Sequence, residues 1–177
     1  MSKSKKHLFK VIIVGDGGVG KSTMVQRLIT GKYIAQKITI GTDLATYSIQ
    51  YNNSIIVLQL WDFAGERRFR FFLPNYSRGA MGCLLCYDIT RRTTFKNLEE
   101  WYEIVKNNAS NPVIYLVGCK NDLGDKKRVV QIKDALEYKE SMGIEKFFET
   151  SSKTGYHIKS VYEELTEDII KKRNIPF

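Results

Sequence analysis

Eight residues near the start of the chain have the types and the spacing of a phosphate-binding loop. They read Gly15-Asp16-Gly17-Gly18-Val19-Gly20-Lys21-Ser22 and stand between an apolar run and a segment with helical periodicity. The glycines let the backbone curl until its N–H groups converge on an anion, and the following helix adds partial positive charge. The Lys21 ammonium would reach the terminal phosphates, and the Ser22 hydroxyl would ligate Mg²⁺. A plain glycine-rich turn would explain one or two glycines but not the Gly-Lys-Ser ending. We therefore predict that Asp16 to Thr23 hold a nucleotide's phosphates.

A second candidate for phosphate chemistry lies at the end of another apolar run, in Trp61-Asp62-Phe63-Ala64-Gly65. A carboxylate at Asp62 would face the phosphate loop across the strand ends, where it can hold a water on Mg²⁺. Gly65 can offer an unhindered N–H to the terminal phosphate, and its conformational freedom would let the loop change shape after hydrolysis. Asp-x-x-Gly alone is a weak signal. Downstream of a phosphate loop, it predicts the metal side of the same site.

Three further segments have the residue types of a guanine site. The Asp122 carboxylate, in Lys120-Asn121-Asp122, can accept hydrogen bonds from the N1–H and the exocyclic amine of guanine, which adenine cannot supply. The Lys120 stem would cover the purine face. A backbone N–H of Ser151-Ser152-Lys153 could meet the base carbonyl, and Tyr33 could stack edge-on against the base. Each segment alone could be an ordinary surface loop, but their order along the chain predicts binding of GTP or GDP.

Apolar runs alternate with periodic segments, which is the pattern of an α/β protein with a parallel sheet. We expect strands at Leu8–Val14, Thr42–Tyr51, Ser54–Asp62, Gly82–Asp88, Val113–Cys119 and Lys146–Thr150. We expect helices at Ser22–Thr30, Thr93–Asn107, Gln131–Met142 and His157–Lys172. Asn52-Asn53 predicts a tight turn between two strands. Residues 31–41 and 65–80 are interpreted as mobile functional loops. The prediction is one domain at 8–173, with a basic extension at 1–7 and a short tail at 174–177.

Composition excludes several classes of protein. The chain has 177 residues with 43% hydrophobic residues, the size and balance of one globular domain. No apolar run approaches the ~20 residues of a membrane-spanning helix, and no signal peptide is apparent at the start. Three cysteines within or at the end of apolar runs argue against a disulfide framework and for a cytoplasmic protein. Cys83 and Cys86 have metal-ligand spacing but no second pair, so buried strand cysteines are favoured over zinc.

The net charge of +9 raises the question of nucleic acid or an acidic membrane. No nucleic-acid-binding motif and no interleaving of aromatic and basic residues is present, so we expect no nucleic acid partner. Much of the excess charge lies at the two ends, in Lys3, Lys5, Lys6, Lys10, Lys171, Lys172 and Arg173. Solvated termini are one interpretation. Weak contact with an anionic membrane, at the periphery of which the protein would lie, is the other.

With these motifs in order, the chain resembles the Ras superfamily of small GTPases, and most closely its Rab branch. The resemblance rests also on Thr39-Ile40-Gly41-Thr42-Asp43, on Trp61-Asp62 with Arg68-Phe69-Arg70, and on Tyr76-Ser77-Arg78-Gly79-Ala80. It implies a P-loop G domain with a six-stranded, mostly parallel sheet flanked by five helices. It also implies a monomeric GTP/GDP switch that hydrolyses GTP and meets effectors, an exchange factor and a GTPase-activating protein.

The resemblance assigns roles in the two switch segments. Thr39 would ligate Mg²⁺ by its hydroxyl and meet the γ-phosphate by its N–H. Leu44, Trp61 and Tyr76 would form an exposed hydrophobic cluster that effectors read in the GTP state, although Trp61 as ordinary core is an equally good interpretation. Lys21, Gly65 and Glu66 would form the catalytic group.

Four departures from the family pattern stand out. Cys119 replaces the asparagine before the guanine-reading lysine, and Phe63 replaces a threonine. The span from Ser22 to Thr39 is one residue short, so that Gln36 falls near the position of a tyrosine that often closes over the phosphates. Glu66 replaces the glutamine that positions the attacking water. An ionised carboxylate accepts hydrogen bonds but cannot donate toward the phosphate, and we therefore predict slow intrinsic turnover.

Other functions remain open at this point. An ATP-dependent P-loop kinase is disfavoured by Lys120 and Asp122, which read guanine. A GTP-bound scaffold with negligible hydrolysis stays possible because of Glu66.

Overall fold

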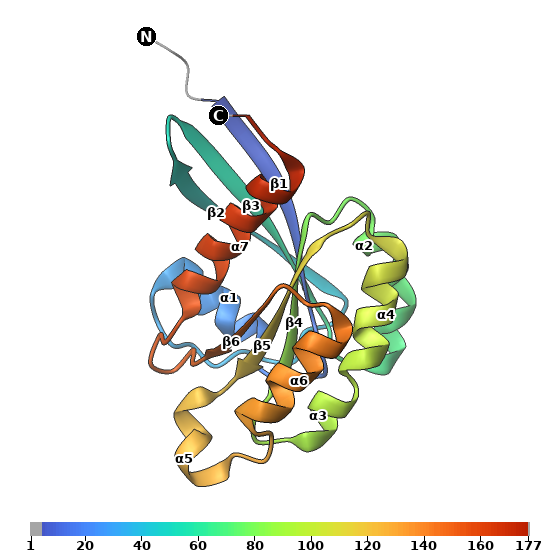
Figure 1. Cartoon of the computed structure of the whole chain (residues 1–177). Helices are drawn as coiled ribbons and strands as arrows, with labels where there is room; N and C mark the ends of the chain where they lie inside the picture. Colours follow the sequence, from blue (N-terminus) through green and yellow to red (C-terminus); the bar gives the residue numbers. More distant parts are fainter. Residues whose placement is uncertain (1–4, 177) are drawn as a thin grey trace.

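A computed structural model describes residues 5–176 of the chain. One sheet of six strands forms its centre (Figure 1), in the order β2-β3-β1-β4-β5-β6. The strands are β1 (Lys5–Val14), β2 (Thr42–Tyr51), β3 (Ser54–Phe63), β4 (Gly82–Asp88), β5 (Val113–Cys119) and β6 (Lys146–Thr150). Within residues 5–176 the β2–β3 pair is antiparallel, and the other four pairs are parallel. The predicted six-stranded, mostly parallel sheet is confirmed.

The strand predictions hold to within a few residues. β2, β4, β5 and β6 have the predicted bounds, and Asn52 adopts the positive φ of 50° that the tight turn after β2 requires. β1 begins at Lys5 rather than Leu8, because Lys5 to His7 pair with Ser54 to Ile56 of β3. Part of the predicted extension at 1–7 is therefore a strand. Residues 1–4 and 177 of the predicted extension and tail lie outside the described residues.

Residues 5–176 contain seven α-helical segments and two 3₁₀ turns, where the resemblance implied five helices. The longer helices are α1 (Lys21–Thr30), α4 (Leu98–Asn108), α6 (Ile132–Met142) and α7 (Ile158–Arg173). The shorter segments are η1 (Arg67–Phe72), α2 (Leu73–Ser77), α3 (Arg92–Lys96), η2 (Asn121–Leu123) and α5 (Gly124–Lys127). The helix predicted at Thr93–Asn107 is divided at Asn97 into α3 and α4. Residues 67–77, which we interpreted as a loop, form η1 and α2 instead.

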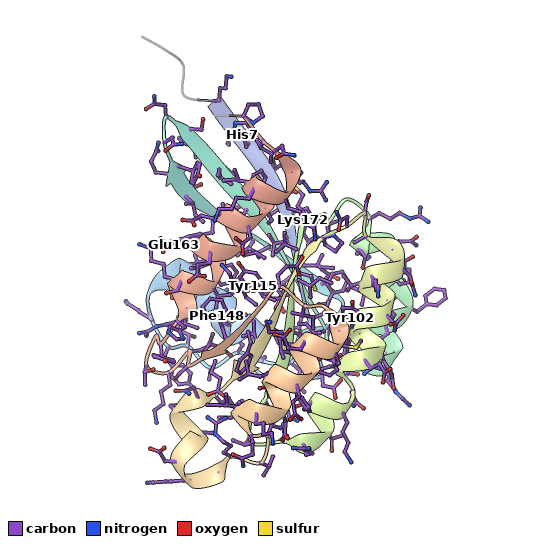
Figure 2. All side chains as sticks on the ribbon, viewed as in Figure 1. His7, Tyr102, Tyr115, Phe148, Glu163 and Lys172 are labelled. Atoms are coloured by element: carbon purple, nitrogen blue, oxygen red, sulfur yellow. The ribbon has the colours of Figure 1, made fainter. Side chains whose placement is uncertain are left out.

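The helices cover both faces of the sheet, as α/β folds with parallel sheets require. On one face, Met24 of α1 and Leu165 of α7 join a buried cluster with residues from β1, β3, β4 and β5. On the other, Leu73 of α2, Trp101 of α4 and Ala135 of α6 pack on a second cluster. Figure 2 shows side chains filling both layers. No helix in residues 5–176 has the length and apolar character to cross a membrane.

The parallel strands all deliver their carboxyl ends to one edge of the sheet, which is where open α/β sheets bind ligands. The loops after β1, β3, β4, β5 and β6 meet at this edge (Figure 1). The opposite edge holds the start of β1 and the end of α7 (Figure 1), so the basic residues of both segments lie away from the loops that follow the strands. There Lys172 donates to the Pro112 carbonyl, immediately before β5.

Candidate nucleotide site

The loop after β1 has the tight curl that the glycine spacing predicted. Gly15 has φ +140°, and a Cβ added there would lie 2.1 Å from the carbonyl oxygen of Cys86. Gly18 and Gly20 also have positive φ values, and Lys21 opens α1 directly after Gly20. The Lys21 ammonium is buried and donates to the carbonyl oxygens of Gly15 at 2.7 Å and Asp16 at 3.0 Å. Burial lowers the pKa of Lys21, which the carboxylate of Asp62 partly offsets.

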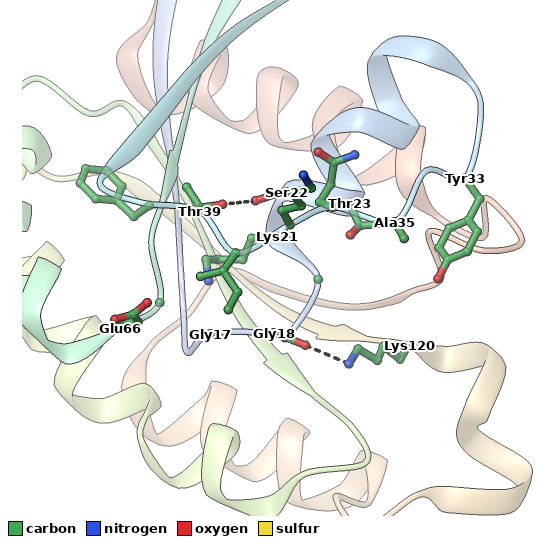
Figure 3. Close-up of a pocket in the computed structure, with 16 residues that line it drawn as sticks. Gly17, Gly18, Lys21, Ser22, Thr23, Tyr33, Ala35, Thr39, Glu66 and Lys120 are labelled. Atoms are coloured by element: carbon green, nitrogen blue, oxygen red, sulfur yellow. Dashed lines mark hydrogen bonds between the residues drawn. The ribbon is translucent and has the colours of Figure 1, made fainter.

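Three predicted metal ligands, which come from three separate segments, lie together beside this loop. The Ser22 hydroxyl donates to an Asp62 carboxylate oxygen and lies 2.7 Å from the Thr39 hydroxyl (Figure 3). Asp62 is 3% exposed, and its Oδ1 is buried without a hydrogen-bond partner among the described residues. Burial raises the pKa of Asp62 to about 6. Hydroxyl and carboxylate oxygens with an unmatched buried acceptor are the donor set that Mg²⁺ prefers, so these residues fit the metal.

A groove of about 510 Å³ runs along the loop and carries most of the predicted phosphate-site residues on its wall. These are Gly17, Gly18, Gly20, Lys21, Ser22, Thr23, Tyr33, Thr39, Gly65, Glu66 and Lys120. Gln36, Lys37, Ile38 and Phe63 also line it. Ala35, Lys37 and Ile38 belong to none of the predicted motifs. They line the groove because residues 31–41 cross in front of α1 (Figure 3).

An adjoining cavity of about 220 Å³ brings together the predicted guanine-site residues. Its wall contains Val19, Tyr33, Cys119, Lys120, Asp122, Ser152 and Lys153. Ser151 lies behind this wall, fully buried, and its hydroxyl donates to Asp122 Oδ1 at 2.7 Å. That hydrogen bond orients the carboxylate and leaves its other lone pairs for a ligand. The two cavities share Gly20, Thr23, Tyr33 and Lys120.

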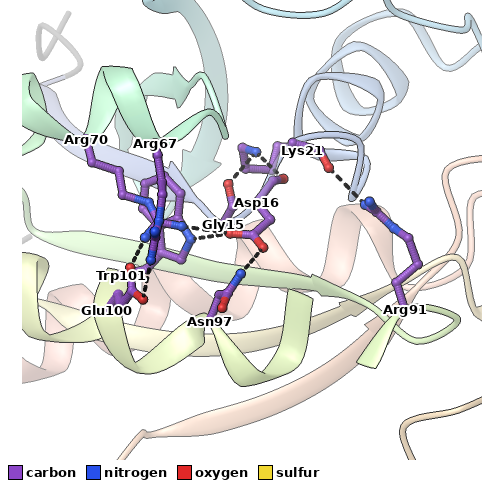
Figure 4. Close-up of polar contacts among 10 residues, drawn as sticks. Gly15, Asp16, Lys21, Arg67, Arg70, Arg91, Asn97, Glu100 and Trp101 are labelled. Carbon is purple, nitrogen blue, oxygen red and sulfur yellow. Dashed lines mark hydrogen bonds and ion pairs between the residues drawn. The ribbon is translucent and has the colours of Figure 1, made fainter. Parts of the chain in front are cut away.

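Asp16 has a different position from the other predicted site residues. Its carboxylate accepts hydrogen bonds from Arg70, from Asn97 and from the indole N–H of Trp101 at 2.7 to 3.0 Å (Figure 4). Neither nucleotide cavity has Asp16 in its wall. The side chain therefore anchors the phosphate loop to η1 and α4, and only its backbone lies at the predicted site. Sequence spacing does not show to which side a loop residue turns.

Buried support for the base loop comes from residues that no motif identified. Glu149 of β6 is 8% exposed and pairs with Arg128 through both carboxylate oxygens, at 2.5 and 2.8 Å. Asn121 donates to the same carboxylate at 2.7 Å. The loop that carries Lys120 and Asp122 is thereby fixed to the neighbouring strand. A carboxylate inside an apolar run is the signal that could have found Glu149, because buried acids require partners.

Comparison with known proteins decides the family. The sequence model of the family described as "Ras family" matches residues 10–171 of this chain. The chain belongs to the Ras family. It is 38% identical over 174 residues to Ras-related protein RABA2a of Arabidopsis thaliana, covering 96% of this chain and 79% of that protein. It is 37% identical over 171 residues to human Ras-related protein Rab-19, covering 96% and 78%. It is 39% identical over 173 residues to Ras-related protein Rab-2B of Dictyostelium discoideum, covering 97% and 85%.

Membership makes the chain a small GTPase of the Rab kind, as the sequence motifs indicated. Members of this family are GTP hydrolases that bind GTP or GDP, generally with Mg²⁺, and act as nucleotide-dependent switches with effectors and regulators. The six-stranded P-loop fold and the Rab resemblance are both confirmed.

The hydrophobic cluster expected on this Rab-type GTPase has mixed burial. Leu44 is 54% exposed and lies opposite Trp61 in the antiparallel pair of β2 and β3. The centre of the Tyr76 ring lies 5.5 Å from that of the Trp61 ring. Trp61 is half-buried and also packs on the core, so both interpretations of this residue describe part of its environment. The Lys10 ammonium lies 4.6 Å from the centre of the Trp61 ring, which removes Lys10 from the group of free terminal charges.

The glycine at the start of the loop gives a direct test of its packing. We expect Gly15→Ala to abolish nucleotide binding and lower the melting temperature, because its Cβ would overlap the Cys86 carbonyl at 2.1 Å. Gly31→Ala is the matched control, since Gly31 also has positive φ but nothing lies within 4 Å of its added Cβ. The control should cost only the backbone strain of ~1 kcal/mol and still bind GDP. Fluorescent GDP titration and thermal melts measure both. Full GDP affinity in Gly15→Ala would contradict this packing.

Proposed function

We propose that the chain binds GTP and GDP through the two adjoining cavities, holds Mg²⁺ through Ser22, Thr39 and Asp62, and hydrolyses GTP slowly. The convergence of these three oxygen ligands beside the buried Lys21 ammonium carries the proposal. The base would be read by Asp122, which Ser151 orients. The bound metal would polarise the phosphates and neutralise charge there.

Lys21, Gly65 and Glu66 are the proposed catalytic group, since all three line the same groove. The Glu66 carboxylate forms an ion pair with Arg68, with 2.8 Å between Oε2 and Nε. A carboxylate in an ion pair accepts hydrogen bonds from a water but has none to donate toward a phosphate oxygen. Slow turnover follows, because one donor to developing charge is missing.

Single-turnover hydrolysis tests the role of Glu66. We expect Glu66→Gln to convert bound GTP on the order of tenfold faster than wild type, since an amide restores a donor while keeping an acceptor. Glu66→Ala should be no faster than wild type, and Arg67→Gln is the control one residue away. The measurement follows bound GTP and GDP over time after loading with Mg²⁺. A faster Glu66→Ala would refute a positive role for this carboxylate.

The guanine assignment makes a separate prediction. Asp122→Asn should lose GDP affinity on the order of a hundredfold, because the amide cannot accept from both N–H groups of guanine. The same variant should gain affinity for XDP, whose base carries an oxygen in place of the exocyclic amine. Asp125→Asn, on the exposed α5, is the control. Competition titrations against fluorescent GDP give the affinities of wild type and of both variants for GDP and XDP. An unchanged preference for GDP over XDP in Asp122→Asn would exclude Asp122 as the residue that reads guanine.

A scaffold that holds GTP without hydrolysing it is the second candidate function. The Glu66–Arg68 ion pair favours it, because it engages the carboxylate with a neighbour in its own segment. Bound GTP that remains intact over days in wild type, and in Glu66→Gln as well, would exclude unaided turnover. It would leave the scaffold and a switch that hydrolyses GTP only with a GTPase-activating protein.

Effector contact through the switch segments and weak membrane contact through the basic ends complete the proposal. Effectors would meet the exposed Leu44 and Tyr76 beside Trp61.

The membrane contact would be made at the opposite edge of the sheet, where Lys5 and Lys6 are exposed at the start of β1. Lys172 already pairs with Glu145 at 2.7 Å, and Arg173 donates to the Ser110 carbonyl.

The membrane contact should be weak, at ~1 kcal/mol for each free basic residue near an anionic surface. We expect partial co-sedimentation with phosphatidylserine vesicles at low salt, its loss at high salt, and none with neutral vesicles. Lys5→Gln with Lys6→Gln should reduce the bound fraction. Absence of sedimentation at low salt would end this part of the proposal.

A further inference from the structure

A buried carboxylate at the end of β4 pairs with Lys120, which lines the proposed base cavity, and with a second cation. Asp88 is 1% exposed, and its Oδ2 lies 2.7 Å from the Lys120 ammonium and 3.1 Å from Nε of Arg91. Its Oδ1 accepts from the backbone N–H and the hydroxyl of Thr90 at 2.8 and 2.6 Å. Burial alone would raise the pKa of Asp88, but the hydrogen bonds from Lys120 and Thr90 outweigh it and the pKa lies below its ordinary value.

Both side chains that pair with Asp88 also donate hydrogen bonds to the phosphate loop, where they bind the carbonyl oxygens of two successive residues. Arg91 Nη2 donates to the Gly17 carbonyl at 2.9 Å (Figure 4), and Lys120 Nζ donates to the Gly18 carbonyl at 2.9 Å (Figure 3). A Cβ added at Gly18 would lie 3.4 Å from Arg91 Nη2, so the guanidinium lies against the loop itself. Asp88, Arg91 and Lys120 thus form a clamp on two consecutive peptide groups.

The geometry of a trans peptide shows what such a clamp does. Each C=O and the N–H that follows it share one rigid plane and point in opposite directions. Fixing the Gly17 carbonyl therefore fixes the direction of the Gly18 N–H, and fixing the Gly18 carbonyl does the same for the Val19 N–H. Glycine peptides would otherwise rotate freely. A cation on the carbonyl side also strengthens the N–H as a donor.

We propose that Arg91, held by Asp88, is a positioning residue that keeps the N–H groups of the phosphate loop aimed at the diphosphate and so slows nucleotide release. The inference rests on the proposed guanine-nucleotide site and adds a residue to it. It also gives the buried Asp88 a role, because this carboxylate holds both Lys120 and Arg91 in position to donate to the phosphate loop. Arg91 is 44% exposed, so its removal opens no cavity in the core.

The test is GDP dissociation from full-length variants, followed with a fluorescent GDP in excess unlabelled GDP. We expect Arg91→Ala to release GDP about tenfold faster than wild type, the loss of one charge-assisted hydrogen bond. Arg91→Lys, which can keep one of the two contacts, should lie between wild type and Arg91→Ala. Arg92→Ala is the matched control, because the neighbouring Arg92 pairs with Asp134 and donates to the Val129 carbonyl instead. It should release GDP at the wild-type rate.

A second measurement separates positioning from general stability. Guanosine lacks phosphates, so its affinity, measured by competition, should change by less than about twofold in Arg91→Ala if only the phosphate loop is affected. Equal losses for guanosine and GDP with a lower melting temperature would show a structural role and overturn the inference. Unchanged GDP release, or slower hydrolysis of bound GTP with unchanged release, would overturn it as well. Wild type that binds no GDP would instead overturn the proposed function on which it rests.

Discussion

The site depends on the close approach of backbone to backbone around the phosphate loop. A Cβ at Gly15 would meet the Cys86 carbonyl at 2.1 Å, and one at Gly65 would meet the N atom of Gly17 at 2.0 Å. Both contacts exist because β1 lies between β3 and β4, with Ile13 opposite Asp62 and Val14 opposite Leu85. Only residues without a side chain permit this approach. The loops after β1 and β3 are therefore packed tightly against each other and against the end of β4, and the chemistry of the candidate site follows from that proximity.

The buried charged side chains also gather at this edge of the sheet. Lys21, Asp62, Asp88 and Glu149 are the four charged side chains that are buried within residues 5–176, and all lie at or beside the carboxyl ends of strands. Burial of a charge is costly unless a partner offsets it. Asp88 has Lys120 and Arg91, and Glu149 has Arg128 and Asn121, so both are satisfied inside the protein. Asp62 keeps one oxygen without a partner among residues 5–176, which distinguishes the proposed metal side of the site from its supports.

Much of this arrangement could be predicted from the sequence, because motif spacing and apolar runs are local signals. Four strands have the predicted bounds, and the phosphate and base motifs meet as expected. What escaped prediction depends on tertiary contacts. Lys5 and Lys6 extend β1 only because β3 pairs with them. η1 has no helical periodicity of its own and is held by Arg70, which binds Asp16. Arg91 stood in no motif, and its approach to Gly17 spans 74 residues of sequence.

The two ends of η1 are held by contacts of different strength. Arg67 is 79% exposed and pairs with Glu100 at 3.2 Å, a surface ion pair of the kind worth ~0–1 kcal/mol. Arg70 is 11% exposed, pairs with Asp16 and lies 4.3 Å from the Trp101 ring centre. The two ends of η1 are therefore held unequally, firmly at Arg70 and weakly near Glu66. The Asp16 that anchors Arg70 belongs to the phosphate loop, so the Arg70 end of η1 is fixed directly to the candidate nucleotide site.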